Sequence, residues 1–393
     1  MFDDGVERTD AIAYPGQGAF EFMNLSSWPA SANARRVLEA WFARYPRNHK
    51  PQLRGLLRSR DDHQHYAAVF ELYLHELLST VSNDVRVHPR VGRRQTRRPD
   101  FRVQSMSGQA FYVEATTISG GSVSKEPAGL LNPFMRALGN VCSDDFFMEI
   151  GTSGELRSQP SARHCRRKLA MWLDSLDYDS VKDAIENPRA TRPSFPWRHG
   201  GWTITFTPIP KGTRRGIADP VTRGIQHAGA GVVDSKSPVR DAVSDKASAY
   251  GTLRLPFVIA VNTLDIGFDD IDLHSAMLGD ERWSVTNTSA GPHAEPTSRA
   301  SNGVFWQAGE PRRRHVSAVA VFRSLLPWNM HRDLVDVYHN PWATHPLMPY
   351  TLPLRAWVPE NGEMRKRSGV PIAQLLDLPE VWPGKRISRS GTE

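Results

Sequence analysis

The chain is poor in cysteine and has no long apolar segment. Only Cys142 and Cys165 occur among 393 residues, without the spacing of paired metal ligands, which argues against a disulfide scaffold and against a cysteine zinc site. The longest apolar runs, such as residues 255–261, are about seven residues, whereas a membrane span needs roughly 20. The first residues, Met-Phe-Asp-Asp, lack the basic and then apolar pattern of a signal peptide. These absences favour a chain that works in the cytoplasm, without a membrane partner.

Lysine is also scarce, although the chain is basic. Nine of its 49 basic residues are lysine and the other 40 are arginine, against 42 acids, which gives a net charge of +7. Guanidinium groups suit phosphate recognition, so this composition is consistent with a nucleic-acid partner, although a GC-rich genome would produce the same bias. Hydrophobic residues make up 39% of the chain, which is enough for a packed core and excludes wholesale disorder.

The arginines cluster in one segment. Seven of them lie between Arg86 and Arg102, where Asp100 is the only acid. Two interpretations stay open: a solvated basic loop, or a surface that neutralises phosphates. The arginines of this segment that we expect to contact nucleic acid are Arg90, Arg93, Arg94, Arg97 and Arg98. Further basic patches at residues 163–168 and 312–314 could extend such a surface or be ordinary solvated faces.

The hydrophobic periodicity predicts an α/β protein. Helices with one apolar face are expected over residues 31–45, 61–78, 163–177 and 239–250. Short strands bounded by turn residues are expected over residues 84–88, 99–104, 110–117, 146–150, 202–208, 257–262 and 317–322. Residues 105–109 have the length of a hairpin loop between two of these strands. No regular element is predicted in the segment 327–359, which is rich in proline and tryptophan, and the polar tail from Asn361 is expected to be loosely ordered.

Two carboxylates belong to the predicted hairpin. Asp100 follows Pro99 at the start of one strand, and Glu114 lies on the next strand. The alternation of side chains along a strand places Glu114 and Thr116 on the same face. Adjacent strands can therefore present two carboxylates side by side, and these repel each other unless a cation shares the site. Mg²⁺, a hard ion held by one or two carboxylates, is the expected cofactor, with Mn²⁺ as its substitute.

A third carboxylate, Glu71, lies on the helix predicted before the hairpin. On a helical wheel it lies beside the apolar stripe, near Leu74 and Leu78. A carboxylate at that position costs free energy unless it has a partner. The partner could be a metal ion or its bound water, an arginine side chain, or solvent reached from the edge of the stripe.

The order of these features resembles the PD-(D/E)XK nuclease superfamily, whose restriction-endonuclease-like fold has an α-β-β-β-α-β core. The helix with Glu71, a strand, Pro99-Asp100 and then Glu114-Ala115-Thr116 on a hairpin correspond to its first four elements. The later helix 239–250 and strand 257–262 would supply the last two. The resemblance covers residues 60–118 and 238–263, about a fifth of the chain.

The resemblance implies roles for individual residues. Asp100 and Glu114 look like the metal ligands, and the backbone carbonyl of Ala115 looks like an additional ligand. Glu71 is similar to the helix carboxylate that holds a metal-bound water in many members of the superfamily. The implied reaction is metal-assisted hydrolysis of a phosphodiester bond.

Thr116 departs from the pattern of the superfamily. A lysine usually occupies this position, where it orients or deprotonates the attacking water and stabilises the charge that develops on phosphorus. A threonine hydroxyl can orient a water but brings no charge. Some members carry the lysine on the following helix instead, and Lys246 is the candidate for such a migrated lysine. The alternative is that Lys246 is an ordinary surface residue.

We therefore expect a metal-dependent nuclease that acts on nucleic acid. DNA is the favoured substrate, and the choice between DNA and RNA stays open. The first alternative is a catalytically degenerate module of the same fold, which binds nucleic acid or a protein partner without hydrolysis. An interaction protein with no nucleic-acid role is a third possibility. The oligomeric state stays open, a dimer included.

The expected organisation has a nuclease-like core with additions. The core covers residues 56–265 and carries an insertion at about 119–237. A helical extension over residues 1–55 precedes the core. A C-terminal extension over residues 266–360 packs on it, and a basic tail follows from residue 361 to residue 393.

Overall fold

The computed structural model divides the chain into two compact units. Unit 1 comprises Met1–Thr9, Met23–Gly120 and Asp234–Glu393, and unit 2 comprises Asp10–Phe22 and Gly121–Val233. The long insertion in unit 2 thus has limits close to the predicted 119–237. The structure describes residues 1–9, 17–91, 97–118, 130, 134, 137–138, 141–187, 190–211, 219–220, 235–250, 253–264, 268–288, 291–379 and 382–383.

Unit 1 is built on an eight-stranded mixed sheet with the order β1-β2-β3-β9-β14-β15-β16-β17. Neighbouring strands are antiparallel except for the parallel pairs β3–β9, β9–β14 and β15–β16. With helices on the sheet, this architecture confirms the predicted α/β class. The strands are β1 (Ser82–Val87), β2 (Phe101–Ser105), β3 (Ala110–Ile118), β9 (Phe257–Thr263), β14 (Ala318–Arg323), β15 (Val335–His339), β16 (Ala356–Glu360) and β17 (Glu363–Arg367).

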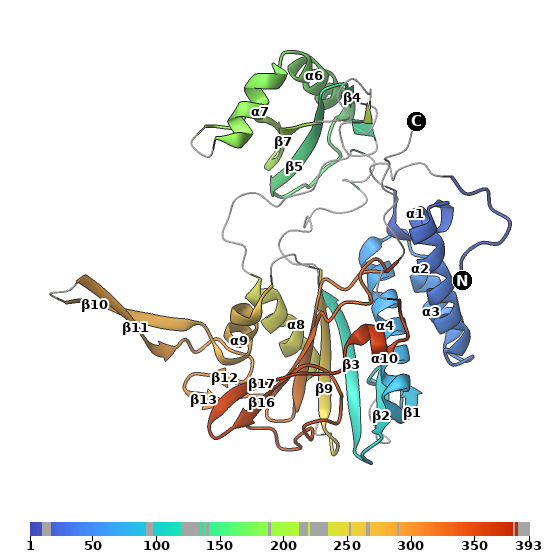
Figure 1. The fold of residues 1–393 in the computed structure, drawn as a ribbon, viewed down its shortest axis with the longest axis vertical. Coiled ribbons are helices and arrows are strands. Elements are labelled where there is room, and N and C mark those ends of the chain that lie inside the picture. The colour runs from blue at the N-terminus through green and yellow to red at the C-terminus, as the bar shows by residue number, and fades with distance from the viewer. Residues whose placement is uncertain are drawn as a thin grey trace. The chain divides into compact units, whose positions relative to one another are not determined.

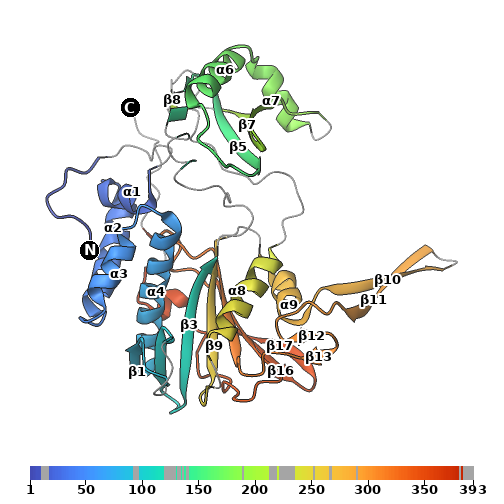
Figure 2. The same cartoon turned by 180° about the vertical axis from the view of Figure 1, so that it is seen from behind.

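Helices cover both faces of this sheet (Figures 1 and 2). On one face, the Phe70 ring of α4 packs against the Phe322 ring of β14, with 5.0 Å between the ring centroids. On the other face, Val239 of α8 and Leu273 of α9 join a buried cluster with Ile259 of β9. The helices of the chain outside the long insertion are α1 (Ala19–Leu25), α2 (Pro29–Arg44), α3 (Lys50–Leu57), α4 (Asp62–Thr80), α8 (Lys236–Ser248), α9 (Asp270–Leu278) and α10 (Ile372–Leu375).

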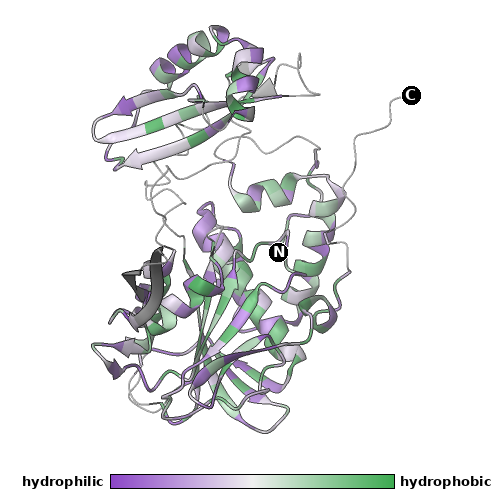
Figure 3. Cartoon of the chain, turned by 60° about the vertical axis from the view of Figure 1, so that its left-hand side comes forward, coloured by the Kyte–Doolittle hydropathy of each residue, from purple (hydrophilic) through white to green (hydrophobic). Residues whose placement is uncertain are grey.

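Local sequence explains the two elements that matter most for the site. Every residue of β9 is buried because helices lie on both faces of the sheet, as the uninterrupted apolar run predicts. Figure 3 shows the same concentration of hydrophobic residues in the central strands. Helix α4 begins after Asp61, whose carboxylate accepts hydrogen bonds from the backbone N–H groups of His63 and Gln64. This cap satisfies donors that the first helical turn leaves without an intrahelical partner.

The structure has strands where the sequence predicts none. Strands β15 and β16 lie within the segment rich in proline and tryptophan. The prediction of a loosely ordered tail from Asn361 is wrong for residues 363–367, which form β17, and for residues 372–375, which form α10. β17 pairs with β16 from Ala356↔Arg367 to Glu360↔Glu363. Backbone pairing alone defines this strand, because an edge strand can be charged and needs no apolar alternation.

Unit 2 has its own small core. Trp202, Ile204 and Phe206 alternate along the central strand of a three-stranded sheet and pack with Leu169 and Leu173 of a covering helix. The elements of this unit are β4 (Cys142–Ser143), β5 (Phe146–Gly154), α6 (Ala162–Asp174), α7 (Tyr178–Glu186), β6 (Phe195–His199), β7 (Trp202–Pro210) and β8 (Asp219–Pro220). The remaining strands of the chain form two hairpins in unit 1, β10 (Glu281–Thr288) with β11 (Gly291–Arg299) and β12 (Trp306–Gln307) with β13 (Glu310–Pro311).

Candidate functional site

A pocket opens where β3 runs past the end of β2. The last β2–β3 pair is Phe101↔Val113, and β3 continues to Ile118 along β9. Because no β2 residue lies beside this part of β3, side chains of α4 and α8 reach the same space from the two faces of the sheet. The pocket has a volume of about 210 Å³. We name it the carboxylate pocket, and its lining includes Glu71, Asp100, Ala115, Thr116 and Lys246.

Asp100 is held at the end of the β2–β3 ladder. Its Oδ2 accepts a hydrogen bond of 2.7 Å from the backbone N–H of Ala115, so the carboxylate replaces the next backbone partner of β3. Burial, together with the negative charges of Glu114 and Glu71, raises the pKa of Asp100 to about 8, although the Ala115 N–H and Lys246 act to lower it. The surroundings of Asp100 therefore disfavour its ionised form.

Glu114 lies behind the pocket wall and is only 5% exposed. Its Oε1 lies 2.7 Å from Lys246 Nζ, and its Oε2 accepts a hydrogen bond of 2.6 Å from the Tyr250 hydroxyl. The Tyr250 hydroxyl also lies 2.9 Å from the Arg98 carbonyl, but it has one proton and can serve one acceptor at a time. Burial and the hydrogen bond to Glu114 raise the pKa of Tyr250, which keeps it a donor.

Glu71 has a tyrosine as its partner. The Tyr45 hydroxyl, just after α2, donates a hydrogen bond of 2.5 Å to Glu71 Oε1. Burial raises the pKa of Glu71, and this hydrogen bond opposes the shift. The arginine partner considered from the sequence is not found among the described contacts of this carboxylate. Glu71 therefore faces the pocket as a desolvated carboxyl group that is held in place by a phenol.

Two histidines complete this side of the site. His88 Nε2 lies 3.7 Å from Glu71 Oε1 and His88 Nδ1 lies 3.8 Å from Asp100 Oδ1, so its ring bridges the two carboxyl groups. The His49 ring packs edge-on against it, with 5.0 Å between the ring centroids. Burial lowers the pKa of both histidines. His88 reaches this position with a backbone φ of 47°, a conformation that is uncommon outside glycine.

Backbone groups of β3 also reach the pocket. The N–H of Ala115 points to the side where β2 has ended, and the carbonyl of a strand residue points to the same side as its N–H. Thr116 lines the pocket beside it. His63 Nε2 lies 3.0 Å from the Thr117 carbonyl, which ties the start of α4 to the end of β3. Oxygen atoms of the kind that ligate metal ions thus lie together at the end of β3.

The predicted basic segment is described in part. Arg90, Arg97 and Arg98 are exposed, whereas Arg93 and Arg94 lie outside the described residues. The charge of Arg98 is near enough to lower the pKa of His49 and His88, although burial is the larger cause. Positive charge therefore borders the carboxylate pocket.

The structure brings five of the predicted site residues to one pocket and places Glu114 directly behind Lys246. Sequence reasoning missed Tyr45, His49, His88 and Tyr250. Only Tyr250 has a usable signal in the sequence, because a residue four positions after Lys246 lies one helical turn further along the same face. Nothing in the sequence around the other three distinguishes them from ordinary buried aromatic residues.

The donors fit a hard divalent cation in kind, because they are carboxylate and carbonyl oxygens. Within the residues that the structure describes, no group of three or more histidine, cysteine, aspartate or glutamate side chains is arranged to hold a metal ion. Both oxygens of Glu114 have hydrogen-bond partners, so Glu114 would have to exchange one of them for an ion.

No protein-family model, curated protein or solved structure matches the chain. None of the helices described is both long enough and apolar enough to cross a membrane.

Proposed function

We propose that the chain is a metal-dependent nuclease that hydrolyses DNA at the carboxylate pocket. The observation that carries this proposal is the convergence of Glu71, Asp100 and Lys246 on one pocket, with Glu114 bonded to the lysine. The element order α4-β1-β2-β3-α8-β9 has the α-β-β-β-α-β sequence of the core that the resemblance implies, which supports the same proposal. A cytoplasmic location, expected from the cysteine usage, belongs to it as well.

Asp100, Glu114 and the Ala115 carbonyl would hold Mg²⁺, or Mn²⁺ in its place. When bound, the ion supplies positive charge that polarises the phosphodiester and activates water. Lys246 neutralises negative charge that develops on the phosphate, the role that Thr116 is unable to fill. Glu71, held by Tyr45, orients the attacking water and accepts a proton from it. The Thr116 hydroxyl provides a second hydrogen bond to that water.

The test is cleavage of plasmid DNA in Mg²⁺ or Mn²⁺, with EDTA as the metal-free control. Asp100→Asn keeps the shape of the side chain and an oxygen that accepts from the Ala115 N–H, whereas Glu114→Gln keeps the shape but only one of the two acceptor oxygens that serve Lys246 and Tyr250. We expect both variants to cut at least about 100-fold more slowly. Asp84→Asn, an exposed carboxylate on β1, is the matched control and should cut like the wild type. Full activity in both site variants removes the assignment.

A second candidate function is binding without hydrolysis. It is favoured by the ion pair between Glu114 and Lys246, which already neutralises one carboxylate without a metal ion, and by Thr116 in the lysine position. A protein of this kind binds DNA equally well in Mg²⁺ and in EDTA and never cuts it. Fluorescence anisotropy with a labelled duplex, run beside the cleavage assay, separates the two candidates.

A further inference from the structure

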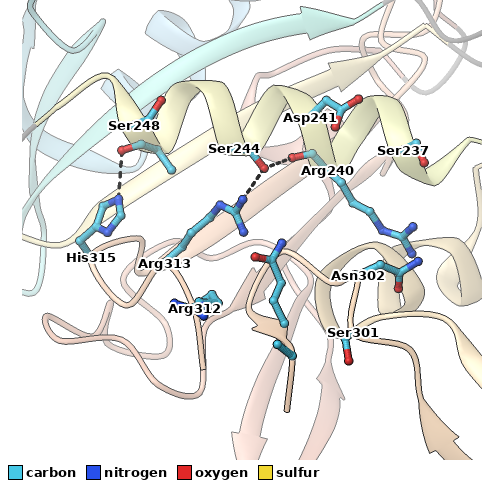
Figure 4. Close-up of a pocket in the computed structure, with 13 residues that line it drawn as sticks. Ser237, Arg240, Asp241, Ser244, Ser248, Ser301, Asn302, Arg312, Arg313 and His315 are labelled. Carbon is cyan, nitrogen blue, oxygen red and sulfur yellow. Dashed lines mark hydrogen bonds between the residues drawn. The ribbon is translucent and has the colours of Figure 1, made fainter. Parts of the chain in front are cut away.

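A second pocket lies on another side of α8 (Figure 4). It has a volume of about 940 Å³ and is lined by α8 and by residues 301–302, 307–308, 312–313 and 315. Lys246 lines the carboxylate pocket, whereas Ser244 and Ser248 line this one. Positions two apart on a helix differ by about 200° in direction, so the two pockets face different ways. We name this second cavity the arginine pocket, after Arg240, Arg312 and Arg313 in its lining.

Arg313 is a half-buried cation without a carboxylate partner in the described part of the chain. Its Nη1 donates a hydrogen bond of 2.8 Å to the Val304 carbonyl, and its Nη2 donates one of 2.7 Å to Ser244 Oγ. A guanidinium has five N–H donors, so three are left for a ligand. Burial lowers the pKa of Arg313, and the positive charge of Arg312 lowers it further. A desolvated cation beside a second cation is stabilised by an anion.

The other charged groups of the pocket differ in how far they are satisfied. Arg312 is exposed, and its one ion-pair contact in the described part of the chain, from Nη2 to Glu310 Oε2, is 4.0 Å long. Arg240 is neutralised, since its Nη2 lies 2.8 Å from Asp280 Oδ1 and donates to the Ser275 carbonyl as well. Asp241 is the one acid of the lining and is exposed. Two guanidinium groups, those of Arg312 and Arg313, are therefore available to an anion.

The backbone holds Arg313 in place before any ligand arrives. Arg313 has a φ of 47°, in the left-handed region. Its carbonyl accepts hydrogen bonds from the Val316 N–H at 2.9 Å and from Asn340 Nδ2 at 3.3 Å. These contacts fix the loop that carries the guanidinium, so binding would cost little ordering of this side chain.

The lining indicates which anion fits. Besides the arginines it consists largely of hydroxyl and amide side chains, and its one aromatic ring, His315, is tied by Nε2 to the Ala247 carbonyl at 3.0 Å. Such a lining offers donors to oxygen atoms and contains no phenylalanine, tyrosine or tryptophan ring on which a base could stack. Forked guanidinium donors match the oxygens of phosphate. The volume lies in the range of small-molecule sites.

We propose that the arginine pocket binds a phosphate ester through Arg312 and Arg313. The ester can belong to a small phosphorylated molecule or to the backbone of a nucleic acid, and the experiment below distinguishes these sources. The proposal is independent of the hydrolase reaction, because the two pockets share α8 but no lining residue.

Isothermal titration calorimetry of the full chain with inorganic pyrophosphate and with a short oligonucleotide tests this site. We expect saturable binding of at least one probe, weakened about tenfold by Arg312→Gln and by Arg313→Gln. Arg314→Gln is the matched control, because Arg314 is an exposed neighbour that donates to the Trp342 carbonyl and does not line the pocket. It should bind like the wild type.

The pattern of binding identifies the source of the phosphate. Pyrophosphate binding that depends on both arginines indicates a small phosphorylated ligand, and oligonucleotide binding alone indicates a backbone phosphate. Loss in Arg312→Gln is informative even if Arg313→Gln fails to fold, because Arg312 is exposed. No saturable binding of either probe overturns the proposal, and so does an Arg314→Gln variant that is weakened as much as Arg312→Gln.

Discussion

Lys246 Nζ lies 2.7 Å from Glu114 Oε1, although 132 residues separate the two in the sequence. The ammonium group therefore reaches the carboxylates from the helix after the hairpin, and Thr116 occupies the strand position next to them. Helix α8, rather than strand β3, thus supplies the positive charge of the carboxylate pocket.

The contact between Lys246 and Glu114 predicts that an ammonium group carried by β3 can replace that of Lys246. Lys246→Met removes the ammonium and should slow DNA cleavage about 100-fold, because the developing charge on the phosphate loses its partner. Adding Thr116→Lys to that variant puts an ammonium back on the pocket from β3 and should restore part of the rate. Single-turnover cleavage kinetics measure both effects.

Lys236→Met is the control for this pair of variants. Lys236 lies on the same helix but pairs with Asp280, outside the carboxylate pocket. It should leave the cleavage rate within about twofold of the wild type. A Lys246→Met protein that is folded and fully active contradicts the role given to the lysine.

The pKa of Asp100 predicts a pH-dependent stability. The ordinary value of 3.8 applies to the unfolded chain, whereas the folded protein has a value of about 8. Between these values the folded state binds the proton more tightly, so the stabilisation is complete below pH 3.8 and is lost as the pH rises to about 8. Asp100→Asn does not titrate. In urea unfolding, its stability relative to the wild type should therefore increase from about pH 5 to about pH 8.5. A constant difference contradicts the raised pKa.

A divalent cation should offset this loss in the wild type. At about pH 8, millimolar Mg²⁺ should raise the melting temperature by about 2 °C or more, because a ligand of the folded state stabilises it by mass action. The Asp100→Asn protein should respond much less. Differential scanning fluorimetry with and without Mg²⁺ measures the shift, and equal responses in the two proteins place the ion elsewhere.

The exposed arginines before Asp100 should govern the salt dependence of DNA binding. Substituting both Arg97 and Arg98 with glutamine should reduce the slope of log affinity against log salt by about 0.9 for each phosphate contact that is lost. Arg365→Gln on β17, at the opposite edge of the sheet, is the control. Fluorescence anisotropy over a salt series tests this prediction. An unchanged slope in the double variant means that these arginines bind no phosphate.

Asp336 should be important for stability. It is fully buried, and its carboxylate pairs with Arg355 at 2.5 and 2.7 Å and with Arg323 at 2.7 Å. Asp336→Ala leaves Arg355 without its acid and leaves Arg323 with Asp270 alone. The free energy of unfolding should therefore fall by about 3 kcal/mol. Asp84→Ala, which breaks an exposed ion pair with Arg86, should cost less than about 1 kcal/mol. Similar losses in urea unfolding of the two variants would show that the buried acid has no special role.

Local patterns predicted the elements around the carboxylate pocket well. Helix α4, expected at 61–78, is observed at Asp62–Thr80, because its apolar stripe and its Asp61 cap are both readable from adjacent residues. Strand β15 shows the limit of such patterns. All five of its residues are buried, including Asp336, whose arginine partners lie elsewhere in the chain. A buried acid breaks the alternation by which strands are recognised.

The site itself was readable only in part. Its acids and Lys246 stand out because a hairpin with two carboxylates and a scarce lysine are visible in the sequence. No such sequence pattern marks the residues that contact Glu71. Tyr45 lies 26 residues earlier, and His88 reaches Glu71 through a left-handed backbone, so neither contact follows from periodicity. The first depends on how α2 packs against α4, and the second on how the chain leaves β1 beside Asp100, and both are properties of the assembled fold.

The long insertion between β3 and α8 has a consequence during translation. Asp100 and Glu114 leave the ribosome first, and Lys246 is synthesised 132 residues after Glu114, a delay on the order of ten seconds. During that time β3 also lacks β9, its parallel neighbour. The nascent chain thus carries an unpaired strand edge until β9 emerges, and such an edge is prone to associate with other chains.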